Sequence, residues 1–174
     1  MITLSIIGSS GNNGKMNIFS EENFQEMMHK IENIVGDEWK NVTLVSGGSS
    51  GADHLAVKLT IKHKCKLNLH LPCHFKTTHQ KFDEKNNYGK LLNDLHFQFS
   101  EKINSNTLEE LDYVIQLSST NIFIYKGFLQ RNVPVSQSDG MIAFTDSGKN
   151  TPGKGGTFHT WNLCKSENKI HINI

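Results

Sequence analysis

The 174-residue chain contains no long apolar run. None of its apolar segments approaches the roughly 18 consecutive residues that a helix needs to cross a bilayer. The N-terminus enters the apolar segment ITLSII directly, without the basic leader and long apolar region of a secretion signal. We therefore expect no association with a membrane.

An excess of charge of either sign is also absent. The chain has 18 Lys and Arg against 17 Asp and Glu, which gives a formal net charge of +1 at pH 7. A protein that binds DNA or RNA through its phosphates carries a marked basic surplus. Nucleic acid is therefore not expected as a partner, and the basic residues between Lys62 and Lys66 are interpreted as the solvated end of a helix.

Cysteine is scarce: the chain has only Cys65, Cys73 and Cys164. An odd number without a paired short spacing argues against a disulfide framework and for a reducing compartment. Together with the missing leader, this predicts a cytoplasmic protein. The histidines near Cys73 do not repeat the short ligand spacings of a structural zinc site, so no metal and no cofactor are predicted.

Glycine, by contrast, is concentrated where expected strands end. The clearest case is the segment 42–59, VTLVSGGSSGADHLAVKL, which combines a short apolar run, a glycine-rich turn and an amphipathic helical pattern. Such a junction leaves backbone N–H groups unpaired at the positive end of the helix dipole, where an anion is stabilised. Glycine also lets the backbone approach a ligand closely. We expect Ser49 or Ser50 to cap the helix and Asp53 to lie in its first turn.

The same arrangement occurs twice more, as GSSG after the apolar segment 2–7 and as PGKGGT after a late apolar segment. Ten of the 14 glycines lie at the ends of expected strands: Gly8, Gly11, Gly14, Gly47, Gly48, Gly51, Gly148, Gly153, Gly155 and Gly156. In an open parallel sheet the carboxyl ends of the strands share one edge, and ligands bind in the crevice there. Three glycine turns at that edge predict a ligand that carries phosphate or resembles a nucleotide.

The order of the apolar segments predicts the fold class. Strands are expected at 2–7, 42–45, 67–71, 122–125, 139–145 and 169–174, and helices at 21–35 after Ser20, 52–59, 88–99, 108–115 with Thr107 as the cap, 133–137 and 158–165. Alternating strands and helices predict an α/β protein with an open, mainly parallel, Rossmann-like sheet flanked by helices. We expect residues 1–174 to form a single domain.

The middle of the chain, about 73–117, is expected to be a helical and loop insertion. Residues 73–87 are polar and indicate a long loop. A connection of this length either covers a site or has only a packing role, and the sequence leaves both alternatives open. His96, on the helix 88–99, is likewise either a core histidine or a group that stacks on the base of a ligand.

The glycine turns, in this order, resemble the SLOG superfamily. GSSG, GGSSGADHLA, the Arg131–Asn132 pair and GGTFHTW carry the resemblance, which covers both ends of the chain well and the middle poorly. The superfamily includes the Lonely Guy (LOG) phosphoribohydrolases and DprA-like domains. The resemblance implies a Rossmann-like sheet, a phosphate held at Gly155, Gly156 and Thr157, and a ribose or base near the first two glycine turns. It also implies a homodimer.

One departure from the hydrolase branch concerns the chemistry. In that branch an arginine before the late strand and a glutamate three residues after the motif threonine act on the N-glycosidic bond. Arg131 matches the arginine, but Thr160 occupies the position of the glutamate. A hydroxyl cannot supply the charge that stabilises an oxocarbenium-like centre or orients water. Asp146, directly after the expected strand 139–145, is the preferred replacement.

Other carboxylates are weaker candidates for that replacement. Asp53 is expected on the same edge of the sheet, and Glu101, Glu109, Glu110 and Asp112 lie in the insertion. Arg131 is expected to bind phosphate or carboxylate through both ends of its guanidinium. The full predicted ligand-binding set is Gly8, Ser9, Ser10, Gly47, Gly48, Ser49, Gly51, Asp53, Arg131, Asn132, Thr145, Gly155, Gly156 and Thr157.

Two functions of different classes follow. In the first, the chain binds a nucleotide or nucleotide-derived small molecule without turnover, to sense it, present it or sequester it. In the second, it is an enzyme, a LOG-like hydrolase or transferase that acts on the N-glycosidic bond of a nucleoside monophosphate or an ADP-ribose-like compound through Arg131 and Asp146. A weaker third alternative is an interaction domain that kept the sheet and lost the pocket.

Overall fold

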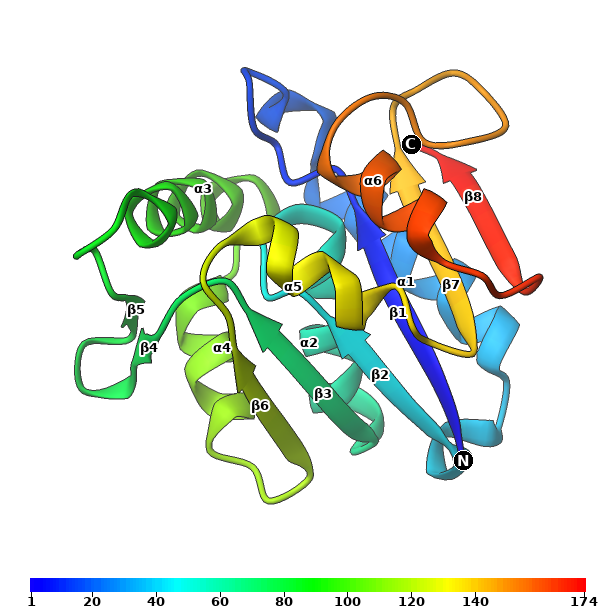
Figure 1. Cartoon of the computed structure of the whole chain (residues 1–174), viewed down its shortest axis with the longest axis horizontal. Coiled ribbons are helices and arrows are strands. Elements are labelled where there is room, and N and C mark those ends of the chain that lie inside the picture. Colours follow the sequence, from blue (N-terminus) through cyan, green and yellow to red (C-terminus); the bar gives the residue numbers. More distant parts are fainter.

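The protein, described over residues 1–174 by a computed structural model, is built on one six-stranded parallel sheet (Figure 1). The strands lie in the order β6–β3–β2–β1–β7–β8, and every neighbouring pair is parallel. They are β1 (Ile2–Gly8), β2 (Val42–Ser46), β3 (Lys66–Leu71), β6 (Thr120–Ile124), β7 (Gly140–Thr145) and β8 (Lys169–Asn173). The expected α/β class is confirmed.

Helices cover both faces of the sheet, but unequally. One face carries α1 (Glu21–Val35), α2 (His54–His63), α3 (Asn87–Ile103) and α4 (Thr107–Ile115), which we call the back layer. The other face carries only α5 (Phe128–Val135) and α6 (Gly156–Leu163), the front layer, which lies toward the viewer in Figure 1. The sheet is therefore doubly wound, with most of its packing on one side.

The core has the same asymmetry. A cluster of 29 buried apolar residues lies between the sheet and the back layer, whereas the cluster under the front layer has seven. Two of the four inner strands, β2 and β7, are buried along their whole length, as parallel strands covered on both faces should be. On β3, Leu67, Leu69 and Leu71 belong to the larger cluster.

Helix α1 follows its expected pattern. Ser20 caps it in a capping box with Asn23, and Phe24, Met27, Met28, Ile31 and Val35 are its buried residues. Gly36 ends the helix with a positive φ of 59°. These five residues form the stripe that packs into the core, whereas Ile34, which the apolar spacing also assigns to the stripe, is 45% exposed.

The structure corrects two helix boundaries. The cap of α4 is Asn106, which accepts from the N–H of Glu109, rather than Thr107, whose buried hydroxyl bonds to His96. The helix predicted at 133–137 begins earlier, at Phe128, and Pro134 lies in its last turn. Proline removes only one hydrogen bond there, and the helix ends a residue later, so the helix tolerates it.

The insertion is smaller than predicted. Helix α4 packs against α2 and β6 as the crossover helix between β3 and β6. The region expected to be a loop, 73–87, holds a small antiparallel hairpin of β4 (Phe75–Lys76) and β5 (Lys81–Phe82). The side-chain amide of Asn93 on α3 bonds both the N–H and the C=O of Phe82. The additional elements are therefore this hairpin and α3.

Two further findings bear on the sequence-based expectations. No helix combines the length and the apolar character that a membrane span requires. Cys65, Cys73 and Cys164 are free and buried.

Candidate functional site

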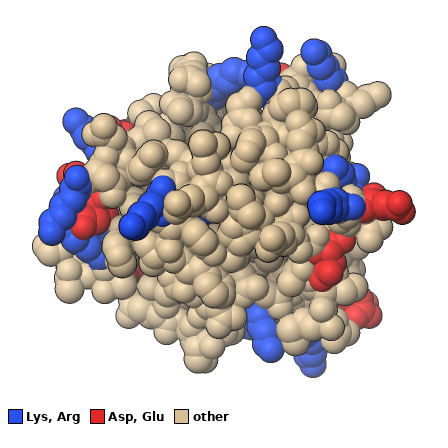
Figure 2. All heavy atoms as spheres, viewed as in Figure 1, with Lys and Arg blue, Asp and Glu red and all other residues tan.

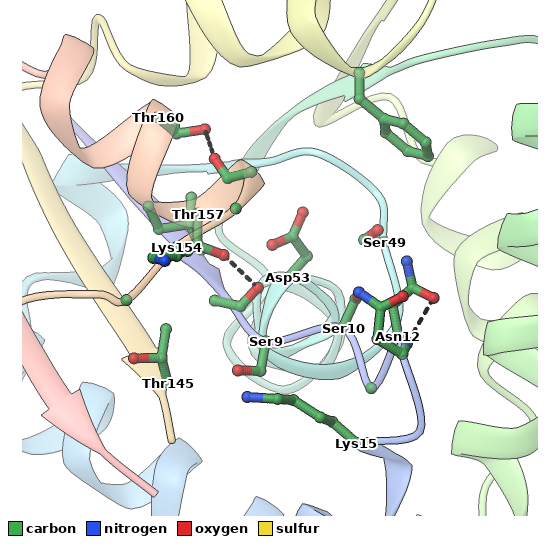
Figure 3. A pocket seen from close by; sticks show the side chains of 18 of the residues that line it. Ser9, Ser10, Asn12, Lys15, Ser49, Asp53, Thr145, Lys154, Thr157 and Thr160 are labelled. Carbon is green, nitrogen blue, oxygen red and sulfur yellow. Dashed lines mark hydrogen bonds between the residues drawn. The ribbon is translucent and has the colours of Figure 1, made fainter. Parts of the chain in front are cut away.

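A cavity of about 370 Å³ opens at the carboxyl ends of β1 and β7 (Figure 3). From β1 the chain builds the sheet outward through β2 and β3 on one side, and later through β7 and β8 on the other. The strand order therefore reverses between β1 and β7. In doubly wound folds ligands bind at this switch point, where loops diverge and leave a crevice.

The cavity brings together most of the predicted site residues. Those that line it are Gly8, Ser9, Ser10, Ser49, Asp53, Arg131, Asn132, Thr145, Asp146, Gly155, Gly156 and Thr157. They come from turns that are distant in the sequence, and Figure 3 shows Ser9, Ser10, Asp53, Thr145 and Thr157 around one space. Gly47, Gly48 and Gly51 do not line it.

The first and third glycine turns contact each other directly. The Thr157 hydroxyl donates to the carbonyl of Gly8 at 2.8 Å, and the N–H of Ser9 donates to the carbonyl of Phe144 at 2.9 Å. A Cβ on Gly8 would lie 2.1 Å from the carbonyl oxygen of Phe144. A glycine is needed at this position because the turn runs against β7.

The second glycine turn holds the first glycine turn in place through hydrogen bonds. The N–H of Ala52 donates to the carbonyl of Ser9 at 3.0 Å, and the Ser50 hydroxyl donates to the carbonyl of Ser10 at 2.7 Å. A Cβ on Gly51 would lie 2.2 Å from the carbonyl oxygen of Ser9. Neither Ser49 nor Ser50 caps the following helix, so that expectation is wrong: the Ser50 side chain holds the first turn instead.

Gly47 and Gly48 are also close-packing positions. A Cβ on Gly47 would lie 1.3 Å from Nη1 of Arg131, and one on Gly48 would lie 2.3 Å from Cδ2 of Leu71. The carbonyl of Gly48 accepts from Nε2 of His96 at 3.2 Å. The sequence suggested that these glycines expose backbone to a ligand, but their neighbours are protein side chains.

Arg131 is held in a buried ion pair at the base of the cavity. Its Nη1 lies 3.1 Å from Oδ2 of Asp53, and both side chains are at most 10% exposed. Burial raises the pKa of Asp53, and the charge of Arg131 together with hydrogen bonds from backbone amides counteracts that rise. Nε of Arg131 is buried and has no hydrogen-bond partner in the protein. The Asp53 carboxylate thus fixes the guanidinium in place, and the N–H group at Nε of Arg131 is left to donate a further hydrogen bond.

A second ion pair lies at the rim. Nζ of Lys15 is 2.8 Å and 3.1 Å from the two carboxylate oxygens of Asp146, and both residues line the cavity. The hydrogen bond from Lys15 is the main cause that lowers the pKa of Asp146. Lys15 is not among the predicted site residues, although it follows Gly14 directly in the first glycine-rich turn.

The third glycine turn carries the start of α6 into the cavity. Gly155 precedes the helix with φ of 109°, and no side chain caps its first turn. Lys154 also lines the cavity, without a carboxylate within ion-pair distance. Uncapped N–H groups and a lysine at a helix N-terminus favour an anion.

Thr160, which the resemblance to the hydrolase branch pairs with a glutamate, lines the cavity. Its hydroxyl donates to the carbonyl of Gly156 at 3.0 Å, one turn back in the same helix. The side chain is buried and its donor is already used. It therefore offers no charge to a reacting centre.

The far side of the cavity is apolar. Leu91 and Leu95 of α3 and Phe128 of α5 line it, and α3 lies on the opposite side of β1 from α6 in Figure 1. Both leucines lie at helical spacing within the predicted helix 88–99. The first half of α3 therefore borders the cavity, and the same helix also packs into the core through Leu92 and Phe99, so the insertion has both of the roles left open for it.

His96 itself does not line the cavity. It is fully buried, with Nδ1 2.9 Å from the Thr107 hydroxyl and Nε2 bonded to Gly48. Burial is the main cause that lowers its pKa to about 3, so the ring is neutral at pH 7. Of its two alternatives, the structure favours the core histidine.

The four acidic candidates of the insertion lie away from the cavity. Glu101, Glu109, Glu110 and Asp112 are absent from its lining, and Glu110 bonds to His54 and Lys58 behind the second glycine turn. No group of three His, Cys, Asp or Glu side chains is arranged to hold a metal ion. The carboxylates of the site are Asp53 and Asp146, each already paired with a cation.

Comparisons with known proteins give one informative match. The chain is 39% identical over 181 residues to the uncharacterized protein R261 of Acanthamoeba polyphaga mimivirus, and the alignment covers 99% of this chain and 96% of that protein. No family model matches the chain, and no solved structure matches it. Identity at this level over nearly the whole of both proteins shows common ancestry, and the chain belongs to the same family as this mimivirus protein.

Proposed function

We propose that the protein binds a nucleotide or a nucleotide-derived small molecule without turnover, as a divergent member of the SLOG superfamily. One observation carries this proposal: a single cavity at the switch point of the sheet has an anion-binding end and an apolar wall. The anion-binding end consists of the start of α6 with Lys154. The wall consists of Leu91, Leu95 and Phe128.

The two ends suit the two ends of a nucleotide. A phosphate accepts hydrogen bonds from uncapped helix amides and is stabilised by the helix dipole and nearby cations. A purine or pyrimidine is flat and largely apolar, so it packs on aliphatic and aromatic side chains. Between them, Asn132 and the hydroxyls of Ser9, Ser10 and Ser49 supply polar groups for a ribose.

The absence of a free carboxylate among the candidate catalytic positions supports binding of the ligand without cleavage. Thr160 stands where the hydrolases have their glutamate, and its hydroxyl is bonded within α6. Asp53 is buried against Arg131, and Asp146 is paired with Lys15. None of these groups is a free carboxylate facing the cavity.

The proposal is tested by isothermal titration calorimetry with inorganic phosphate, ribose 5-phosphate, AMP, GMP and ADP-ribose. Wild-type protein should bind at least one of the nucleotides more tightly than ribose 5-phosphate. Lys154→Ala should weaken that binding about tenfold, because one charge-assisted contact is lost. Lys165→Ala removes an exposed lysine outside the cavity and is the matched control. Failure of every nucleotide to bind would refute the proposal.

Leu91→Asp separates the two ends of the ligand. A carboxylate on the apolar wall should weaken nucleotide binding while phosphate and ribose 5-phosphate bind as before. Equal losses for all three compounds would contradict the assignment of the base to this wall.

The enzyme remains the second candidate, because Asp146 lines the cavity and its pKa is lowered by Lys15, so it is ionised. Incubation with each nucleotide, followed by heat denaturation and chromatography, distinguishes the two functions. Intact ligand supports binding alone. Free base that disappears with Asp146→Asn would establish N-glycosidic hydrolysis instead.

Two further proposals concern the cellular location of the protein and its oligomeric state. We place the protein in the cytoplasm, which is supported by three cysteines that are free and buried. The homodimer implied by the SLOG resemblance also stays a proposal.

A further inference from the structure

A second cavity opens where β3 and β6 end, at the same edge of the sheet as the first cavity (Figure 1). Its volume is about 490 Å³, and several of the residues that line it are exposed, so it is open to solvent. Its walls come from the segments that follow β3 and β6 and from the start of α3. A mononucleotide in the first cavity would leave this second cavity unfilled.

One aromatic pair forms the wall between the two cavities. Tyr88 of α3 lines the second cavity and Phe128 of α5 lines the first, and their rings meet edge to face with centroids 5.2 Å apart. On α3, Leu91 follows Tyr88 by about one helical turn and lines the first cavity. On the other side, Gly127 precedes Phe128 and lines the second. Because one helical turn is only about 5 Å long, the two cavities are direct neighbours.

The two cavities have the same kind of anion-binding end. Helix α6 follows Lys154 and Gly155 at the first cavity, and α5 follows Lys126 and Gly127 at the second. The two glycines precede their helices with φ of 109° and 102°, and no side chain caps either helix. Neither lysine forms an ion pair. Each helix start therefore favours an anion.

Few negative charges oppose an anion at either helix start. Helices α5 and α6 contain no Asp or Glu. Figure 2 shows that charged side chains are sparse over the centre of the face on which the two helices lie. The two lysines are therefore available to a bound phosphate.

A buried donor without a partner lies in the first turn of α5, between the two cavities. Arg131 is 8% exposed, and its Nε has no hydrogen-bond partner in the protein. The backbone N–H groups of the same turn are also uncapped. Because a buried donor without a partner is unfavourable, this turn favours a ligand that supplies acceptor oxygens.

The walls of the second cavity suit a nucleoside. Tyr88 and Ile124 present exposed aromatic and aliphatic surface, on which a flat base packs. Tyr125 also lines the cavity, and its hydroxyl lies 2.9 Å from Nδ1 of the buried His70, which fixes the ring. The carboxylate of Asp83 offers acceptor oxygens to the hydroxyls of a ribose.

We infer that the ligand is a dinucleotide, with one nucleoside unit in each cavity and phosphate groups at the starts of α6 and α5. This inference rests on the proposed function and extends it to a second half of the ligand. Two neighbouring cavities with similar walls and the same anion-binding ends favour a ligand with two similar halves. A mononucleotide in the first cavity would contact only one of the two helix starts.

Isothermal titration calorimetry of the full chain with AMP, nicotinamide adenine dinucleotide (NAD) and the linear dinucleotide pApA tests the inference. NAD joins its nucleosides through a pyrophosphate and pApA through a phosphodiester, so the two probes distinguish the linkage. At least one of them should bind about tenfold or more tightly than AMP, because the second half binds at a high effective concentration.

Lys126→Ala tests the second cavity by itself, because Lys126 is exposed and forms no ion pair that supports the fold. This variant should weaken binding of the preferred dinucleotide about tenfold and should leave binding of AMP unchanged. Lys154→Ala should weaken binding of both ligands. Lys165→Ala, outside both cavities, is the matched control and should weaken neither.

The result separates failure of the inference from failure of the proposed function. If no nucleotide binds, both are refuted. If AMP binds as tightly as both dinucleotides, or if Lys126→Ala leaves binding of the dinucleotide unchanged, the inference is overturned and the proposed function stands.

Discussion

The back layer and the front layer of this protein differ in what they contribute. The back layer has four helices with charged outer surfaces and covers 29 buried apolar residues. The front layer has two helices of eight residues each and covers seven. Yet the front layer supplies Arg131, Asn132, Gly156 and Thr157 to the cavity. The comparison indicates that the back layer contributes most of the apolar core, whereas the small front layer contributes little core and mainly residues that line the cavity.

The largest effect is expected from a truncation in the back core. Phe99 is fully buried and packs edge-to-face against Phe19 and Phe24. Phe99→Ala should lower the free energy of unfolding by about 3–5 kcal/mol, because it removes a large side chain and leaves a cavity. Urea denaturation followed by circular dichroism measures this loss.

The matched change in the front core is Met141→Ala, which also removes a fully buried side chain. We expect a smaller loss of about 2 kcal/mol there, since fewer buried neighbours surround it. If Met141→Ala costs as much as Phe99→Ala, the proposed division between the layers is wrong.

The next prediction concerns the ion pair that joins the back layer to the front layer. Asp53 stands at the start of α2 in the back layer, and Arg131 reaches it from α5 in the front layer. Asp53→Asn should lower the free energy of unfolding by about 3 kcal/mol, because it leaves a buried guanidinium without its counter-charge. It should also weaken ligand binding, whereas Phe99→Ala should not. The exposed Asp37→Asn is the control for loss of one carboxylate.

The smallest effect concerns the polar contacts of the back layer. Burial alone would raise the pKa of Glu110, but hydrogen bonds from His54 and Lys58 hold the pKa at about 2, below its ordinary 4.5. A lowered pKa stabilises the fold above pH 4.5, and this contribution is lost as the pH falls toward 2. Glu110→Gln should cost about 1 kcal/mol at pH 7 and should flatten the acid side of the stability profile.

Glu109→Gln, a change at the neighbouring exposed carboxylate, should leave that profile unchanged. Urea midpoints measured from pH 3 to pH 7 provide the comparison. A wild-type midpoint that is constant over this range would contradict the role given to Glu110.

The fold was predictable because its signals are local. Apolar segments of strand length, the helical stripe of α1 and the glycines at strand ends are each contained in a few consecutive residues. The sequence predicts a late start for α5 because proline is favoured in the first turn of a helix, whereas Pro134 lies in the last turn. Boundaries of this kind depend on packing that a short segment does not contain.

The site was predictable in part, for the same reason. The cavity-lining residues of the glycine turns directly follow strands. The order of the elements along the chain is therefore enough to place them at one edge of the sheet. The Arg131–Asp53 pair joins positions 78 residues apart, and no pattern in the sequence connects them. Leu91 and Leu95 lie on one face of a helix whose position over the cavity is set by tertiary packing.

The close contact between Gly47 and Arg131 has a consequence for how the family should vary. Only a hydrogen atom on the Gly47 α-carbon leaves room for the guanidinium. The requirement for glycine at position 47 therefore depends on an arginine 84 positions further along the chain. In relatives that have lost the arginine, position 47 should be released to accept alanine or serine, while Gly8 and Gly51, which face backbone, should stay fixed. Correlated substitutions at positions 47 and 131 would identify the relatives in which this pocket has changed.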